Sequence, residues 1–494
     1  MIARKEKIIL GVVIVFLLLC SVFFGARKTD YMVDEVWTFG LANHVGGIMP
    51  SYEYGKKYYG MEVYDDFLQV KSGGRFNYVN VWANQSDDVH PPLYYVFVHT
   101  ISSLFPDTFN MWYGITVNLI AMIIIIIMLY KLAKEITSDV AQSIGIILLY
   151  STSVAFFDTI IFIRMYAMFT MFSILLAYLL KHYWGKVLDR RFYVSFSAII
   201  ILGMLTHYYF LIYTFFACAM FALHLIFEKR FKEFKKCIIV AAIGGIIYML
   251  CWYHIAGHLF RGYRGKEAIQ AAFSVGGLFS KVLVMLETIC SETSMAFTWG
   301  VMAFVIVLAI IRIVKKQFRF NYKVALIITA CLYLLVVVKI APYNDFRYVM
   351  PVIFIYYIVG FTFLANLLGK YIKKINVSCL IIVFVLATNL ANFITRDFYV
   401  PKDYYSSERV EVFDRLKDKT CVVYINDNWE AIYFYVPLQN VESYMFVNNE
   451  NIDILKEIPG EYVLATTGGH LDEIADYVGD SYSTYSNLYY YFME

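Results

Sequence analysis

The distribution of apolar and polar residues divides the chain into long uncharged runs separated by short charged connections. Residues 108–130 and 208–227 contain no acidic residue, lysine or arginine, and each is long enough to cross a hydrocarbon core of ~30 Å as a helix. A first run, 8–26, follows MIARKEK without an obvious small-residue cleavage site. We therefore predict an uncleaved first helix there instead of a signal peptide.

Hydropathy predicts about eleven membrane-spanning helices in all. Their expected extents are 8–26, 108–130, 140–158, 160–181, 192–206, 208–227, 237–255, 296–312, 324–340, 348–368 and 375–394. Two further apolar stretches stay open between a spanning and an interfacial position. Residues 91–105 are few and open with two prolines, which favours an amphipathic helix on the outer membrane surface. Residues 275–290 are treated as a re-entrant or interfacial helix.

Basic residues accompany every second connection between these helices. Because lysine and arginine concentrate in cytoplasmic loops, this pattern predicts a multi-pass protein of the cell membrane with a cytoplasmic N-terminus. A crossing by 91–105 would invert the pattern. The basic residues concerned are Arg4, Lys5, Lys7, Lys131, Lys134, Lys181, Lys186, Arg190, Arg191, Lys229, Arg230, Lys232, Lys235, Lys236, Arg312, Lys315, Lys316, Arg319, Lys323, Lys370, Lys373 and Lys374.

The C-terminal part of the chain differs in pattern from the rest. After residue 395 the apolar runs shorten and charges are interspersed. TCVVYIND, AIYFYVP, SYMFV and EYVLATTG are typical of strands, whereas ERVEVFDRLKDK, NIDILKEI and HLDEIADYVG are typical of helices. We expect a transmembrane domain, 1–395, with an outer loop, 27–109, and a small extracytoplasmic α/β domain, 396–494.

Composition supports a membrane protein. The 494 residues are 60% hydrophobic and 16% charged, with a mean hydropathy of +0.60, so lipid must cover much of the apolar surface. The net charge of +3 is too small to suggest a nucleic-acid partner. The eight cysteines contain no CxxC pair, and we interpret them as small hydrophobic residues.

Polar side chains gather at the predicted outer face. Asp87 or Asp88 could simply cap a helix that begins at Pro91, and Asp34 and Glu35 could be solvated charges at the membrane surface. Arg164 is placed within the outer end of a spanning helix, where an arginine is costly and usually functional. The residues of this face are Asp34, Glu35, Asp87, Asp88, His90, Arg164, His207, Tyr208, Arg261, Arg264, Lys266, Asp345 and Arg347.

The order of four motifs resembles a known enzyme class. A first span is followed by Asp34-Glu35, then by HPPLYY, RMYAMF and THYYF. This combination resembles GT-C-type membrane glycosyltransferases of family 39, which include protein O-mannosyltransferases, aminoarabinose transferases of lipid A and lipopolysaccharide glycosyltransferases. The resemblance covers most of residues 1–230, while the later spans match by layout and the tail by position.

The resemblance implies an α-helical polytopic GT-C-like fold, a sugar donor on a polyprenyl phosphate and an acidic base in the first outer loop. It assigns the base to Asp34, with Glu35 orienting the acceptor or tuning Asp34. A second acidic site falls on Asp87 or Asp88. His90 stands where some aminoarabinose transferases have lysine, so its phosphate contact stays open.

The remaining substrate-binding candidates follow from their residue types and motifs. Arginine donates a fork of hydrogen bonds that suits a phosphate, which favours Arg164, Arg347 and the segment of Arg261 and Arg264. Tyr166 and Tyr208 lie in the RMYAMF and THYYF motifs, and His207 lies in the second.

The expected reaction moves a sugar to a hydroxyl group of the cell envelope. A carboxylate that removes the hydroxyl proton accelerates such a step by ~10²–10⁴-fold, and a neighbouring carboxylate raises the pKa of the base. Inversion at the sugar carbon is implied by the resemblance. Asp34, Glu35, Asp88 and His90 are also residue types that hold a divalent cation, so metal dependence stays open.

Other functions remain as alternatives. A transporter would be expected to carry polar or broken sites at the membrane midplane, where this chain is mostly aliphatic and aromatic. A polysaccharide polymerase or ligase for lipid-linked glycans would share the substrates, and a non-catalytic assembly protein would use the tail for binding. Besides the donor and membrane lipids, the expected partner is a glycan, lipid or protein acceptor.

Overall fold

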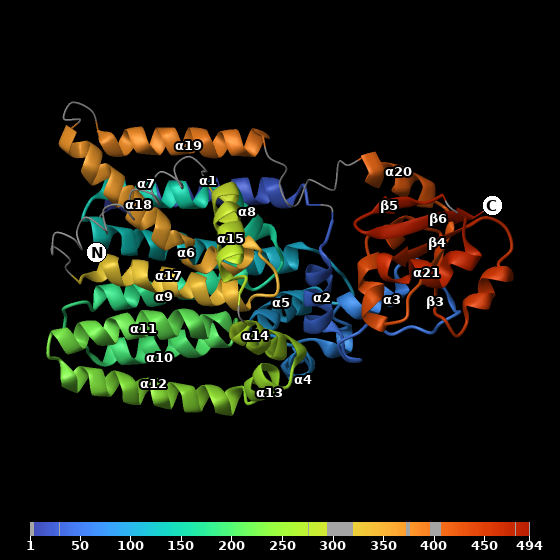
Figure 1. The fold of residues 1–494 in the computed structure, drawn as a ribbon, viewed down its shortest axis with the longest axis horizontal. Coiled ribbons are helices and arrows are strands. Elements are labelled where there is room, and N and C mark those ends of the chain that lie inside the picture. Colours follow the sequence, from blue (N-terminus) through green and yellow to red (C-terminus); the bar gives the residue numbers. More distant parts are fainter. Residues whose placement is uncertain are drawn as a thin grey trace. The chain divides into compact units, whose positions relative to one another are not determined.

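The computed structural model describes residues 4–28, 30–274, 276–293, 320–371, 376–395, 407–479 and 481–493. The chain divides into two compact units, which Figure 1 draws with their helices and strands labelled. Unit 1 comprises Met1–Gly25, Val89–Tyr94 and Ile115–Arg396. Unit 2 comprises Ala26–Asp88, Tyr95–Gly114 and Asp397–Glu494, so it joins most of the predicted outer loop to the tail.

Unit 1 is helical, and its long helices lie side by side (Figure 1). Their apolar residues are exposed on many faces, as expected where lipid and not water surrounds a helix. The helices are α1 (Arg4–Gly25), α6 (Trp112–Thr137), α7 (Val140–Ser151), α8 (Val154–Ile161), α9 (Tyr166–His182), α10 (Arg190–Met204), α11 (Tyr209–Phe227), α12 (Phe231–Cys251), α13 (Ile255–Phe260), α14 (Tyr263–Phe273), α15 (Leu278–Glu292), α17 (Tyr322–Ile340), η2 (Phe346–Tyr348), α18 (Met350–Tyr371) and α19 (Val377–Thr395).

Six helices of the described residues are long and apolar enough to cross a membrane, or up to eight if the bent pairs α7–α8 (62°) and α14–α15 (115°) each form one span. Shorter apolar helices lie at Leu93–Leu104, Tyr166–His182 and Val377–Ala391. The total of about eleven spans therefore stays a prediction, and the expected span 296–312 lies outside the described residues.

Several local expectations are wrong. Arg164 does not lie within a helix, because α8 ends at Ile161 and α9 begins at Tyr166. The helix after the two prolines begins at Leu93, so neither Asp87 nor Asp88 caps it. Asp87 instead ends α4, and Asp88 is its C-cap residue, whose backbone N–H donates to Asn84 O at 3.2 Å. The helix α12 starts at Phe231, so Lys232, Lys235 and Lys236 belong to its first turns, whereas Lys229 and Arg230 lie in the connection as expected.

Unit 2 combines short helices with one sheet. Its elements are α2 (Val33–Asn43), β1 (Lys57–Tyr59), α3 (Glu62–Leu68), η1 (Ser72–Gly74), α4 (Tyr78–Asp87), α5 (Leu93–Leu104, whose first residues belong to unit 1), α20 (Ser407–Leu416), β2 (Thr420–Tyr424), η3 (Asn428–Phe434), η4 (Pro437–Asn440), β3 (Ser443–Val447), η5 (Ile452–Lys456), β4 (Tyr462–Thr467), η6 (Gly468–His470), α21 (Leu471–Ile474), η7 (Ala475–Tyr477), β5 (Ser483–Tyr485) and β6 (Leu488–Met493).

The sheet has the strand order β1-β3-β2-β4-β6-β5. β3, β2 and β4 are parallel, while β1, β6 and β5 pair antiparallel at the two sides. The central strands are buried on both faces, which explains why β2 and β4 are nearly continuous apolar runs. β1 comes from the predicted outer loop and pairs Tyr58 with Tyr444 of β3, so it covers an edge that would otherwise expose unpaired backbone groups.

The predicted strand AIYFYVP is wrong, since this segment forms the 3₁₀ helices η3 and η4. The physical reason is topological. β2 and β3 are parallel neighbours, and a parallel pair needs a crossover that packs on a face of the sheet. Ala431, Ile432 and Phe434 are buried there. NIDILKEI likewise forms only the short 3₁₀ helix η5, whereas the helix over ERVEVFDRLKDK and the strands in TCVVYIND, SYMFV and EYVLATTG are confirmed.

A buried hydrogen bond joins the outer loop to the tail within unit 2. The hydroxyl of Tyr64, in α3, donates to the backbone oxygen of Ala431 at 2.7 Å, and Tyr64 is fully buried. We expect Tyr64→Phe to destabilise unit 2 by about 1–3 kcal/mol, because the Ala431 carbonyl loses its partner in a dry site. Hydrogen exchange of β2 and β3 in the full-length protein measures this loss.

Tyr59→Phe is the matched control, because Tyr59 is 54% exposed and its hydroxyl can bond to water. Its effect should stay within about 0.5 kcal/mol. Equal exchange in the two variants would contradict a role of the Tyr64 hydroxyl in joining the loop to the tail.

Candidate functional site

The centre of the candidate site in unit 1 is a break between two helices. α8 ends at Ile161 and α9 begins at Tyr166, so backbone oxygens at the end of α8 lose their helical partners. The side-chain amide of Asn118, a buried residue of α6, donates to Ile160 O at 3.1 Å and to Phe162 O at 2.7 Å. Asn118 thereby stabilises the break, and Arg164 lies within it.

Arg164 is buried, with 4% of its surface exposed. Its Nη2 lies 3.3 Å from Nε2 of His90, which precedes α5. Because a guanidinium can only donate, Nε2 of His90 is the acceptor and the proton of a neutral His90 is on Nδ1. The histidine of HPPLYY and the arginine of RMYAMF therefore meet in space.

His207 lies in the turn between α10 and α11 and is buried. Its Nδ1 accepts the backbone N–H of Tyr209 at 3.0 Å, so a neutral His207 carries its proton on Nε2. The ring stacks on Phe169, with the centroids 5.1 Å apart, and lies 5.5 Å from Tyr166. Burial, followed by electrostatic interactions with His90, Arg164 and Arg347, lowers the pKa of His207 well below its ordinary value.

Arg347 reaches the same place from η2, the turn before α18. Its Nε lies 3.1 Å from Oδ2 of Asp345. Its guanidinium lies 5.7 Å from the ring centre of Phe162 and 5.9 Å from that of Tyr166. Such distances allow cation–π attraction. His90, Arg164, His207 and Arg347 are called the basic cluster below.

Tyr208 points into a neighbouring group and not into the basic cluster. Its hydroxyl accepts the indole N–H of Trp252 at 2.9 Å and lies 2.7 Å from Nδ1 of His258. Trp252 and His258 are both buried. This chain of hydrogen bonds connects the start of α11 to α13.

The predicted basic segment between α13 and α14 is only partly close to this site. Arg261 is exposed and is the C-cap residue that follows α13. Arg264 pairs with Glu267 at 2.8 Å and lies over Tyr343, and its charge acts on Tyr209. Arg264 is therefore at the margin of the basic cluster, whereas Arg261 is not shown to contact it.

Asp34 and Glu35 belong to unit 2, where both lie in the first turn of α2. Glu35 is fully buried, and its Oε2 accepts from Lys28 Nζ at 2.7 Å and from the backbone N–H of Met32 at 2.9 Å. Asp34 is half-buried, and its backbone oxygen accepts from the Thr38 hydroxyl at 2.9 Å. The two adjacent carboxylates therefore have different surroundings: Glu35 anchors the start of α2, and Asp34 is accessible.

The acidic pair at the end of α4 lies in unit 2 as well. Asp87 is exposed and Asp88 is half-buried. Among the described residues, no three histidine, cysteine, aspartate or glutamate side chains form a group that could hold a metal ion. Asp34, Glu35, Asp88 and His90, for which metal binding was left open, do not form such a group: Glu35 is paired with Lys28, and His90 with Arg164.

Sequence reasoning missed three residues that organise these sites. Asn118 and Lys28 were not selected, although a lone amide inside the uncharged run 108–130 is a usable signal. Trp252, the third, could not be recognised from the sequence, because its partner Tyr208 lies on another helix.

Residues 89–254 match the family model described as Dolichyl-phosphate-mannose-protein mannosyltransferase. No curated protein sequence matches the chain. The fold is similar to two crystal structures of ArnT from Cupriavidus metallidurans. The structure bound to undecaprenyl phosphate has a TM-score of 0.58 at 9% identity, covering 99% of this chain and 98% of ArnT. The apo structure has a TM-score of 0.55 at 10% identity, covering 98% and 97%.

The comparisons confirm the predicted fold class. Both ArnT structures extend over nearly the whole chain, including the small C-terminal sheet domain. The family match begins directly before His90 and includes Arg164 and His207. Residues 89–254 thus resemble the mannosyltransferase family, and the chain as a whole has the GT-C-type fold of the ArnT structures.

Proposed function

We propose that the chain transfers a sugar from a polyprenyl-phosphate donor to a hydroxyl group of a cell-envelope acceptor. The basic cluster binds the donor phosphate, and Asp34 accepts the proton of the acceptor. The observation that carries this proposal is the basic cluster itself: a buried arginine that shares one site with two histidines and a second arginine, all lined by aromatic rings.

The basic cluster has the chemistry that a phosphate monoester or diester requires. Arg164 and Arg347 offer planar forks of N–H donors for phosphate oxygens. His207, kept neutral by burial and its cationic neighbours, offers an Nε2–H donor without adding another charge. The similar ArnT structure holds undecaprenyl phosphate, which supports a polyprenyl phosphate as the product that leaves this site.

The proposed step is one displacement at the anomeric carbon of the sugar. The acceptor oxygen forms a bond to this carbon while the bond to the phosphate oxygen breaks, and the phosphate leaves with the bonding electrons. The hydroxyl proton moves to the carboxylate of Asp34. Attack opposite the leaving group would invert the anomeric configuration, in line with the resemblance to family-39 enzymes.

Glu35 has a positioning role in this proposal. Its carboxylate is committed to Lys28 and to the backbone N–H of Met32, so it is not available as a base. The ion pair holds the first turn of α2 and therefore the direction of Asp34. Asp87 and Asp88 remain candidates for contact with the acceptor, outside the basic cluster.

Replacing Asp34 by Asn should lower sugar transfer by ~10²–10⁴-fold, because the amide cannot accept the hydroxyl proton. The affinity for undecaprenyl phosphate should change by at most about threefold, since the basic cluster is intact. Mass spectrometry of envelope glycans from cells that express each variant measures transfer.

Glu53→Gln, which removes a 76%-exposed carboxylate of the same unit, is the control. Normal transfer by Asp34→Asn would remove Asp34 as the base.

Replacing Arg164 by Gln should weaken binding of undecaprenyl phosphate by about tenfold or more, because charged hydrogen bonds contribute ~1.5–3 kcal/mol each. Arg164→Lys should restore part of the affinity, since lysine keeps the charge but not the planar fork. Titration of the purified protein with the lipid phosphate measures both. The matched variant Arg261→Gln, at an exposed arginine, should bind nearly normally. Equal losses at the two positions would contradict the placement of the phosphate.

The depressed pKa of His207 predicts a pH-dependent stability. The folded protein keeps His207 neutral, whereas the unfolded chain binds a proton below the ordinary pKa of about 6.5. Stability should therefore fall as the pH drops below this value and should not depend on His207 above it. Melting temperatures between pH 5 and pH 8 measure the effect. In the variant His207→Gln the melting temperature should fall less as the pH drops below this value. An unchanged dependence on pH would show that His207 is not the group responsible.

A further inference from the structure

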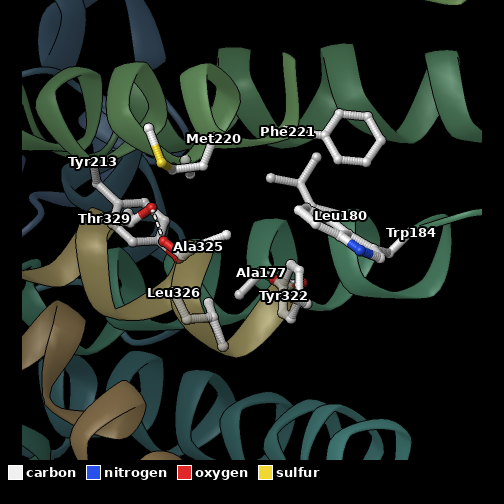
Figure 2. Close-up of a pocket in the computed structure, with 11 residues that line it drawn as sticks. Ala177, Leu180, Trp184, Tyr213, Met220, Phe221, Tyr322, Ala325, Leu326 and Thr329 are labelled. Carbon is white, nitrogen blue, oxygen red and sulfur yellow. Dashed lines mark hydrogen bonds between the residues drawn. The ribbon is translucent and has the colours of Figure 1, made fainter. Parts of the chain in front are cut away.

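The hollow between α9, α11 and α17, which Figure 2 shows in close-up, is too small for a ligand. Its free space is about 10 Å³, about the room that one water molecule needs. Hydroxyl groups in its wall are already bonded within the chain, since Tyr213 donates to Ser173 O at 3.1 Å and Thr329 donates to Ala325 O at 2.8 Å. This hollow is therefore part of the helix packing in unit 1.

Unit 2 contains a dense group of polar side chains at the carboxyl ends of β2 and β4. These strands are parallel neighbours. The chain leaves β2 for β3 on one side of the sheet, and it leaves β4 for β5 and β6 on the other side. The two backbone connections therefore diverge here, and side chains join them. In open α/β sheets such a point commonly carries a functional site.

His470, between β4 and α21, is the centre of this group. Its Nε2 lies 2.9 and 3.0 Å from the two carboxylate oxygens of Glu430 in η3, and its Nδ1 lies 3.1 Å from Oε1 of Glu473 in α21. The side chain of His470 is 14% exposed and that of Glu430 is 7% exposed. A ring nitrogen that faces a carboxylate must donate, so both ring nitrogens carry a proton and His470 is an imidazolium.

The two glutamates accept hydrogen bonds from other groups as well. Oε2 of Glu430 accepts the backbone N–H groups of Asn426 and Asp427, each at 3.1 Å. Oε2 of Glu473 accepts the Tyr424 hydroxyl at 2.7 Å and the side-chain amide of Asn426 at 2.6 Å. Donors therefore face all four carboxylate oxygens, as ionised carboxylates require. The hydrogen bonds of His470 to Glu430 and Glu473 are called the His470 bridge below.

The titratable groups that face the His470 ring are Glu430, Glu473 and Tyr424, whose ring centre lies 5.6 Å away. Burial lowers the pKa of His470, but the hydrogen bonds and negative charges of the two glutamates outweigh burial and raise this pKa above its ordinary value. Burial and the bond to Glu473 raise the pKa of Tyr424 to about 12, so Tyr424 is neutral. The His470 bridge therefore stabilises unit 2 fully below about pH 6.5, and this contribution is lost as the pH rises through the raised pKa.

The bridge acts on a part of unit 2 that supports α2. Glu430 lies in η3, and η3 packs against α2. Tyr435, the C-cap residue of η3, has its ring centre 5.5 Å from that of Tyr31, three residues before Asp34. A displacement of η3 is therefore transmitted to the first turn of α2 through packed side chains.

We propose that His470 is a pH-dependent restraint, which as an imidazolium ties η3 to the connection between β4 and α21 and thereby fixes α2. When one proton leaves to the solvent, a single ring nitrogen still donates, and the other presents a lone pair to a carboxylate. One glutamate is then released, and η3 and α2 loosen. The proposed sugar transfer enters only because α2 carries Asp34, for which His470 becomes a positioning residue.

Hydrogen exchange of the purified full-length protein at about pH 6 and about pH 9 tests the proposal. Each exchange rate is divided by the rate of the unfolded chain at the same pH, which gives a protection factor. The protection of residues 428–434 and of α2 should fall by roughly tenfold or more between the two pH values, because a hydrogen bond between charged groups is lost. The change expected for His207 in unit 1 has the opposite sign.

Two substitutions of His470 separate its charge from its shape. His470→Gln should show the lower protection at both pH values, because the amide has no charge to lose. His470→Lys should keep most of the protection at about pH 9, because lysine remains cationic up to about pH 10.

A second pair of variants keeps the test decisive if His470→Gln does not fold. Glu473→Gln changes a side chain that is 43% exposed and leaves the bond between His470 and Glu430 in place. It should move the loss of protection to a lower pH, because one of the two carboxylates that raise the pKa of His470 is gone. The matched control is Asp472→Asn, at an exposed carboxylate of the same helix, which should leave this pH unchanged.

The proposal fails if the unaltered protein has equal protection of η3 at the two pH values. It also fails if His470→Gln retains the full pH dependence, or if Asp472→Asn has the same effect as Glu473→Gln. Hydrogen exchange requires neither donor nor acceptor, so these outcomes are distinct from a failure of the proposed sugar transfer.

Discussion

The two hydrogen bonds from the amide of Asn118 to backbone oxygens at the end of α8 are the constraint on which the basic cluster depends. An unpaired backbone carbonyl in an apolar interior costs several kcal/mol. Asn118 supplies such a partner to Ile160 O, and it shares Phe162 O with the backbone N–H of Arg164. The break presents Arg164 to His90 and lets α9 begin with Tyr166.

Electrostatic repulsion within the basic cluster is limited because not all of its members are charged. Two arginines are always cationic, so His207 beside them lowers the electrostatic cost of the cluster by remaining neutral. Burial and the neighbouring cations lower the pKa of His207, and Arg164 requires Nε2 of His90 to be an acceptor. Aromatic rings contact the arginines and His207 from several helices. A negatively charged ligand would reduce the repulsion among these cations. This is the physical basis for proposing that the donor phosphate binds to the basic cluster.

Unit 2 shows how segments distant in sequence can support one short helix. α2 carries Asp34, and the buried pair of Lys28 and Glu35 holds its first turn. Breaking a buried ion pair by removing one partner commonly costs ~3–5 kcal/mol, so this pair is a strong restraint. The same unit incorporates β1 of the outer loop into the tail sheet. The tail and the outer loop therefore form one unit, to which α2 belongs.

The sequence by itself determined the helical membrane class and the presence of a small C-terminal sheet domain, and it named all four members of the basic cluster as candidates. It could do so because hydropathy and local motifs depend on neighbouring residues, and because a polar side chain in an apolar run stands out. The tertiary structure alone decided that Arg164 lies in a helix break, that Glu35 pairs with Lys28, and that AIYFYVP crosses over the sheet. Each of these depends on partners far along the chain: a capping amide on another helix, a buried cation or a parallel strand. Local propensity contains no information about such partners, so only the folded chain selects them.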